Sequence, residues 1–218
     1  MPRPPRILLS QSFYHIMTRG NNRHIVFKQD DDYRCYLKLI DKYKTLHPFD
    51  LYHYSFMPNH THYLIQTKSA PDFAIFMKKL NLAYYHYYNR QYGWIGHFWQ
   101  DRYKSKPVGK DNYFIQSGKY IELNAVRAKI VEKPEDYKWS SYNHYAFGEK
   151  NDLITEDFFY RDLDNNSINR QKKYREMLID NLVVISYPKP IWGSVLQAKN
   201  EQNKIDYCLN KTIIRKQQ

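Results

Sequence analysis

A tight β-hairpin predicted in the middle of the sequence constrains the fold of this chain most. Two strand-forming runs, residues 51–56 and 60–67, flank a turn at Met57-Pro58-Asn59. Because side chains alternate between the two faces of a strand, His60 and His62 emerge side by side on one face of the second run. The hairpin therefore predicts an antiparallel pair of strands that presents two neighbouring imidazoles.

Helices and further strands are predicted on both sides of this hairpin. In chain order, the elements are a strand over residues 12–18, a helix that begins at Asp30–Asp32, the hairpin, a helix from a Ser69 cap to a stop before Gly93, a strand over about 96–108, and a helix over about 111–128. The order β-α-β-β-α-β plus a helix predicts an α+β fold with a ferredoxin-like antiparallel sheet. We expect the helices on one face and the other face open to a ligand or partner.

The charge of the chain indicates a polyanionic partner. The 218 residues carry 34 Lys and Arg against 22 Asp and Glu, a net charge of +12. Nucleic acid is the usual partner of so basic a domain, and the 22 Tyr and 11 Phe suit bases stacked from single strands, although most of these rings must serve packing. An anionic membrane surface is the alternative, but no basic amphipathic helix stands out.

Hydropathy argues against a membrane protein. The mean hydropathy is −0.80 and no apolar run is long enough to span a bilayer. The first residues lack the apolar core of a secretory signal. We expect a cytoplasmic, nucleoid-associated protein with no membrane partner.

Two further side chains on the last predicted helix could complete a site with the histidine pair. By itself, a His-x-His pair more often lines a polar sheet face, and a polar helix stripe is usually solvated. However, Tyr120 and Asn124 are four residues apart and project together. The Asn124 oxygen and the imidazoles of His60 and His62 could form a three-ligand metal site with open positions for phosphate. Tyrosine is a poor nucleophile at its ordinary pKa near 10, and a metal at this site would lower that obstacle.

Basic residues near two of the strands are candidates for gripping DNA. Arg102, Lys104 and Lys106 fall at alternate positions of the last strand, which places three cations on one face. We interpret them as a phosphate-binding ridge; the alternative is an edge strand that uses lysines to avoid aggregation. Arg19 and Arg23, after the first strand, are further candidates on charge and placement.

Several motifs occur in an order that matches a known family. They run from Tyr14 to Asn21, Met57 to His62, Trp99 to Ser105, Tyr120 to Ala128 and Trp139 to Tyr142. Over about residues 12–145, the chain resembles the REP-associated tyrosine transposases, relatives of the single-tyrosine HUH transposases of insertion sequences. One departure is Ala125, where the family usually has Pro; Ala continues a helix without strain, so the departure concerns the local helix shape.

The resemblance implies a fold, a chemistry and a substrate. It implies an HUH endonuclease core in which His60 and His62 hold Mg²⁺ or Mn²⁺, Asn124 is the third ligand and Tyr120 is the nucleophile. The implied enzyme cleaves and rejoins single-stranded DNA through a 5′-phosphotyrosine intermediate. Its implied partner is a palindromic, REP-like DNA hairpin beside a short specific tetranucleotide, bound by a monomer or homodimer.

Beyond the motifs, the chain becomes polar, which predicts two parts. Residues 1–147 would form the catalytic domain and residues 148–218 a helical extension of unassigned role, with a linker at 164–167 and a helix over 171–182.

Two rival functions remain. A non-catalytic nucleic-acid binder with a ferredoxin-like sheet explains the charge and the aromatic residues, but not the conjunction of His60, His62, Tyr120 and Asn124. A metal-dependent hydrolase that activates water would leave no covalent adduct between protein and DNA.

Overall fold

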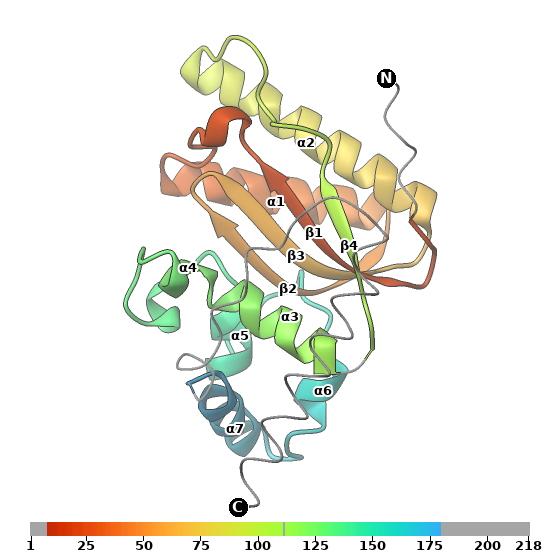
Figure 1. Cartoon of the computed structure of the whole chain (residues 1–218), viewed down its shortest axis with the longest axis vertical. Helices are drawn as coiled ribbons and strands as arrows, with labels where there is room; N and C mark the ends of the chain where they lie inside the picture. Colours follow the sequence, from red (N-terminus) through yellow and green to blue (C-terminus); the bar gives the residue numbers. More distant parts are fainter. Residues whose placement is uncertain (1–7, 111, 180–218) are drawn as a thin grey trace, which may run out of the picture. The chain divides into compact units, whose positions relative to one another are not determined.

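The computed structural model describes residues 8–110 and 112–179 and has an α+β fold. The predicted helix start at Asp111 and the end of the predicted helix over 171–182 lie outside the described residues. In chain order the elements are β1 (Phe13–Arg19), the 3₁₀ turn η1 (Asn21–Arg23), α1 (Asp30–Leu46), β2 (Phe49–Met57), β3 (His60–Thr67), α2 (Ala70–Tyr92), β4 (Lys104–Val108), α3 (Asn112–Glu122), α4 (Asn124–Arg127), η2 (Pro134–Asp136), α5 (Tyr142–Phe147), α6 (Phe158–Arg161) and α7 (Ser167–Ile179) (Figure 1). No helix in this part of the chain is long and apolar enough to cross a membrane.

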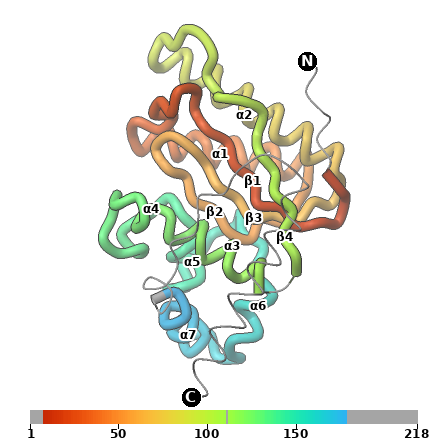
Figure 2. The backbone as a smooth tube through the Cα atoms, viewed as in Figure 1, coloured from red at the N-terminus to blue at the C-terminus, as the bar shows by residue number. Residues whose placement is uncertain are grey.

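The four strands form one antiparallel sheet in the order β2-β3-β1-β4. This order confirms the ferredoxin-like prediction, and β2 and β3 confirm the predicted hairpin. In Figure 2, β4 runs beside β1 although the two strands are far apart in sequence. Because β3 lies between β1 and β2, both of its backbone edges are hydrogen-bonded, and this makes it a rigid support for the histidine pair.

Helices α1 and α2 cover one face of the sheet, as their apolar periodicity predicts. Gln29 and Asp32 form a capping box at the start of α1, and Ser69 caps α2. Helix α2 ends at Gly93, whose φ of 61° is left-handed. The aromatic-rich core under these helices includes Tyr14 and Ile16 of β1, Tyr36 and Ile40 of α1, Phe56 of β2, Tyr63 and Ile65 of β3, and Phe76, Leu80 and Tyr84 of α2.

The opposite face of the sheet is not open, and this part of the prediction was wrong. Helix α3 packs on it through Phe114 and Ile121, which contact Leu64 of β3 and Val108 of β4 in a second apolar cluster. Figure 1 shows α3 next to β2 and β3, on the side of the sheet away from α1 and α2. The apolar stripe of α3 explains this position, because packing against the sheet removes these apolar side chains from water.

The last strand is shorter than predicted. Residues 96–103 do not join the sheet, apart from an isolated bridge between Gly20 and Trp99. Gly96 has a φ of 97°, and the Arg102 amide donates to the Asp101 carboxylate rather than to a neighbouring strand. Arg102 therefore precedes β4 and does not share a strand face with Lys104 and Lys106.

The predicted helix over 111–128 is broken at Leu123. The side-chain amide of Asn124 donates to the carbonyl oxygen of Ile121 at 3.3 Å, and Leu123 adopts a ψ of 2°. A short polar side chain that bonds a nearby carbonyl competes with helical hydrogen bonding. Helix α3 therefore ends at Glu122 and α4 begins at Asn124, so Tyr120 and Asn124 lie on separate helices.

The segment after Phe147 packs on the same domain as far as it is described. Tyr174 of α7 and Tyr160 of α6 join Leu123 and Tyr145 in a buried cluster, and Tyr174 donates a 2.6 Å hydrogen bond to Glu122 of α3. The predicted linker at 164–167 leads directly into α7. Of the predicted extension over 148–218, the described residues thus contribute two helices that cover α3 and α5.

Candidate active site

His60 and His62 stand side by side on β3, as the alternation of the strand predicts. Their ring centroids are 4.8 Å apart, with an interplanar angle of 81°. Burial, followed by the nearby Arg19 charge, lowers the pKa of His60 to about 4. Burial is also the main cause that holds the pKa of His62 well below 6.5, with His15, His60 and Arg19 adding to it. Both rings are therefore neutral at neutral pH, which is the form that binds a metal.

Each imidazole uses its Nδ1 atom in a hydrogen bond. His60 Nδ1 lies 2.5 Å from Oδ1 of Asn59, and His62 Nδ1 lies 2.8 Å from Nε2 of His15. An amide oxygen can only accept, so Nδ1 of His60 carries the proton and its Nε2 carries the lone pair. Neither Nε2 forms a hydrogen bond with any described residue, so these two nitrogens are available to a ligand.

Helix α3 brings Tyr120 to this pair. The Tyr120 ring lies 6.0 Å from that of His62, perpendicular to it, and 5.9 Å from that of His15. The guanidinium carbon of Arg127, on α4, lies 5.1 Å from the centre of the Tyr120 ring. A cation over an aromatic face stabilises the position of the ring.

Asn124 is largely buried at the start of α4. Its hydrogen bond to the carbonyl of Ile121 uses the amide nitrogen, so the oxygen is the atom left for ligation. No hydrogen bond links Asn124 to His60 or His62 among the described residues. The role of Asn124 as third ligand thus stays a prediction.

The available donor atoms suit a divalent cation whose remaining ligands are oxygen atoms. Across residues 8–110 and 112–179, no group of three His, Cys, Asp or Glu side chains is placed to hold a metal ion. A metal on the two free Nε2 atoms would therefore take its other ligands from an amide oxygen such as that of Asn124, from water, or from a DNA phosphate. Imidazole with oxygen ligands is compatible with Mn²⁺ and Mg²⁺.

Several of the predicted DNA-gripping residues share the face of the histidine pair. Arg19 lies opposite His60 in the sheet, and its Nε is buried without a hydrogen-bond partner in the described part of the chain. Lys104 and Lys106 pair with Met17 and His15 across β1 and β4, which places them on this face too. The exposed Arg23 follows on η1, where its carbonyl accepts a hydrogen bond from Asn59.

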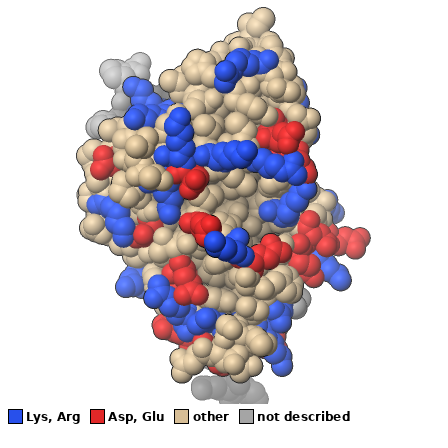
Figure 3. All heavy atoms as spheres, turned by 180° about the vertical axis from the view of Figure 1, so that it is seen from behind, with Lys and Arg blue, Asp and Glu red and all other residues tan. Residues whose placement is uncertain are grey.

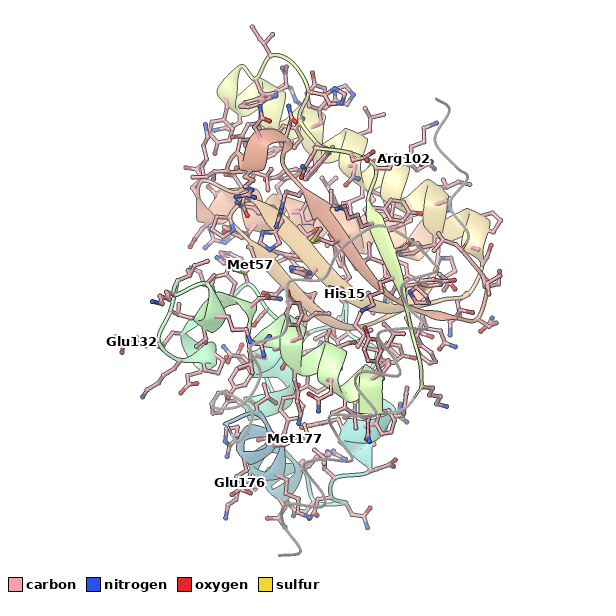
Figure 4. All side chains as sticks on the ribbon, viewed as in Figure 1. His15, Met57, Arg102, Glu132, Glu176 and Met177 are labelled. Carbon is pink, nitrogen blue, oxygen red and sulfur yellow. The ribbon has the colours of Figure 1, made fainter. Side chains whose placement is uncertain are left out.

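Arg102 lies elsewhere. It lines a shallow hollow with Asn81, Leu82 and Tyr85 of α2. Figure 4 labels it next to α2, whereas His15 lies on the sheet beside α3. Its predicted place in a ridge with the two lysines was therefore wrong, because the strand begins only at Lys104.

Three residues beside the site had no role in the sequence analysis, although all three fall within the recognised motifs. These are His15, Asn59 and Arg127. Arg127 follows the Tyr120–Asn124 stripe and could have been found from it. His15 could not, because its contact with His62 depends on the register of β1 against β3.

A family model described as IS200-like transposase matches residues 9–124, which is more than half of the chain. The chain belongs to this family of transposases. The match includes the hairpin, β4, Tyr120 and Asn124, so the transposase carries its histidine pair and its tyrosine within the part that defines the family. As a member of this family it is a DNA-acting enzyme.

A solved structure supports the fold of the transposase. The transposase is similar to a REP-associated tyrosine transposase bound to a REP hairpin, with 18% identity, a TM-score of 0.58, and coverage of 72% of this chain and 93% of that one. It also matches a putative transposase from Deinococcus radiodurans R1, with 19% identity, a TM-score of 0.37, and coverage of 62% and 98%. No curated protein matches the sequence.

Proposed function

We propose that the transposase cleaves and rejoins single-stranded DNA through a covalent bond between Tyr120 and a 5′-phosphate. The observation that carries this proposal is the position of the Tyr120 ring, 6.0 Å from the His62 ring and beside two imidazoles whose Nε2 atoms bind no residue in the described part of the chain. A tyrosine that only filled the core would not require this polar setting.

The residues of the site would have different roles in this reaction. His60 and His62, with Asn124, would hold a Mg²⁺ or Mn²⁺ ion, which supplies positive charge for the phosphate oxygens when bound. Arg19, whose Nε has no hydrogen-bond partner among the described residues, would contact the same phosphate. Arg127 would keep the Tyr120 ring in place.

The reaction conserves the bond energy of the DNA backbone. The Tyr120 oxygen attacks phosphorus, the bond from phosphorus to the 3′-oxygen breaks, and the departing 3′-oxygen takes up a proton. The 5′-phosphate remains esterified to Tyr120. A second 3′-hydroxyl can then attack this ester, which rejoins the strands and releases the tyrosine, so no nucleotide cofactor is required.

We propose a palindromic DNA hairpin as the substrate. The solved relative of similar fold is described as bound to a REP hairpin. The net charge of +12 and the position of Lys104 and Lys106 on the face of the site support a DNA partner for this chain as well.

Tyr120→Phe tests the nucleophile. With a labelled single-stranded hairpin and Mn²⁺ or Mg²⁺, wild-type protein should form an adduct that survives denaturing electrophoresis. Tyr120→Phe should form none and should still bind the hairpin. Tyr113→Phe, on the same helix, is the matched control and should retain adduct formation. Cleavage by Tyr120→Phe, or cleavage with free 5′-phosphate and no adduct, would instead indicate a hydrolase that uses water.

A further inference from the structure

A third histidine, His15, is bound to the histidine pair from the neighbouring strand. It lies on β1, its side chain is 7% exposed, and its Nε2 lies 2.8 Å from Nδ1 of His62, which is 3% exposed. A hydrogen bond between two ring nitrogens requires that one carries a proton and the other a lone pair. The state of His62 therefore depends on that of His15.

Only one of the two possible arrangements leaves His62 able to ligate through Nε2. If His15 donates, Nδ1 of His62 is the acceptor and Nε2 carries the proton, so Nε2 has no lone pair for a metal. If His62 donates, its proton is on Nδ1 and Nε2 is free. A metal at Nε2 thus requires His15 to accept through its own Nε2.

We propose that His15 is a positioning residue, which fixes the tautomer and ring orientation of His62 for metal binding. This inference rests on the proposed function, because it assumes a metal at the His60–His62 pair. Asn59 serves His60 in the same way, since its Oδ1 accepts from Nδ1 of His60. Each ligand then has its own acceptor, one from the hairpin turn and one from β1.

The surroundings of His15 hold its side chain in place, as a fixed hydrogen-bond acceptor requires. Leu64 of β3 and Lys106 of β4 lie opposite it, so His15 is enclosed by strands on both sides. The Tyr120 ring, 5.9 Å away, covers it from α3. A side chain without an acceptor at this position would leave the Nδ1 proton of His62 buried and unpaired, which favours the other tautomer or a turned ring.

Two substitutions separate hydrogen bonding from packing. His15→Phe keeps a planar ring but offers no acceptor, whereas His15→Gln offers an amide oxygen. Loss of such a partner typically weakens metal binding by about 10- to 100-fold. We therefore expect His15→Phe to bind Mn²⁺ about 10- to 100-fold more weakly than wild type in calorimetric titration without DNA, and His15→Gln to recover most of the affinity.

Three measurements complete the test. Hairpin binding in EDTA should be equal in all variants, and Gln66→Leu, on the same sheet face, should bind Mn²⁺ as wild type does. Equal Mn²⁺ affinity of wild type and His15→Phe, or equal loss in His15→Phe and His15→Gln, would overturn the role of His15. If His15→Phe does not fold, His15→Leu, which also offers no acceptor, takes its place, and equal Mn²⁺ affinity of His15→Leu and His15→Gln would overturn the role of His15.

The outcomes distinguish this inference from the proposed function. A wild-type protein that forms the Tyr120 adduct and binds Mn²⁺, with His15 variants unaffected, would refute only the inference. A wild-type protein without Mn²⁺ uptake would refute both the inference and the metal in the proposed function.

Discussion

At the scale of single residues, a buried histidine away from the candidate active site lies in a strongly charged environment. His53 of β2 lies between two carboxylates, with Nδ1 at 2.9 Å from Glu122 and Nε2 at 3.2 Å from Asp157. Burial by itself would lower its pKa, but the hydrogen bonds to Asp157 and Glu122 outweigh it and raise the pKa to about 9. His53 is therefore protonated at neutral pH and joins β2, α3 and the start of α6.

This pKa predicts that the protein loses stability in mildly alkaline solution. Between pH 6.5 and about 9 the folded chain holds a proton on His53 that the unfolded chain has released, so the free energy of unfolding falls as the pH rises. The contribution is fully present below pH 6.5 and amounts to about 3 kcal/mol. Urea denaturation at a series of pH values measures it.

His53→Gln should be less stable at pH 6.5 and should lack most of this pH dependence. His97→Gln, which removes an exposed histidine, should keep the wild-type dependence. A wild-type free energy of unfolding that stays constant from pH 6.5 to 9 would show that His53 is not protonated in the folded state.

At this scale, the sequence predicted site residues that are neighbours in the chain or belong to a recognised motif. His60 and His62 were predicted as neighbours from strand alternation, and the structure brings Tyr120 to them. The links from His15 to His62 and from His53 to Glu122 were not predicted, because they depend on strand register and on where α3 packs. A single sequence does not specify such long-range contacts.

At the scale of elements, the contact between α3 and β2 positions Tyr120. Gly118 lies one helical turn from Ile121 on the side of α3 that faces the sheet, and a Cβ atom there would be 2.8 Å from Nε2 of His53. His53 cannot move away easily, because both of its nitrogens are bound to carboxylates. The absence of a side chain at position 118 is what allows α3 to approach β2 so closely.

We therefore expect Gly118→Ala to destabilise the protein, although alanine normally stabilises a helix. At an exposed helix position, replacement of Gly by Ala would raise the free energy of unfolding by about 1 kcal/mol. Here the overpacking should cost about 1–3 kcal/mol in the free energy of unfolding. Chemical denaturation measures the change, and Gln116→Ala on the same helix serves as control, with a shift below about 0.5 kcal/mol. A stabilised Gly118→Ala would mean that α3 lies farther from His53 than described.

The errors of prediction at this scale have local causes. Periodicity placed α1, α2, β2 and β3 correctly, because these elements have clear caps or alternate regularly. It failed over residues 96–103, which were predicted as part of the last strand although Gly96 adopts a left-handed φ of 97° that does not continue a strand. It also treated α3 and α4 as one helix, because the competition of the Asn124 side chain for the Ile121 carbonyl leaves no trace in hydrophobic spacing.

At the scale of the whole described domain, helices cover both faces of the sheet, and the candidate active site lies near the end of α3. The side opposite to the view of Figure 1 carries basic and acidic side chains intermixed, as Figure 3 shows. On α1, Arg34 pairs with Asp30 and Asp31. In contrast, Arg19, Lys104 and Lys106 lie on the sheet face of the histidine pair. Under the proposed function, these are the charges that contact DNA.

This distribution predicts which lysines control the salt dependence of DNA binding. Each phosphate contact that is lost should reduce the slope of log K against log salt by about 0.7 for single strands and about 0.9 for duplex. Lys104→Gln and Lys106→Gln should each reduce the slope for hairpin binding by about this amount. Fluorescence anisotropy measures the slope at salt concentrations from about 50 to 300 mM, around physiological ionic strength. Lys172→Gln removes the same charge from α7, where the side chain is 69% exposed, and should leave the slope unchanged. Equal reductions in all three variants would show that net charge, and not the face of the active site, governs binding.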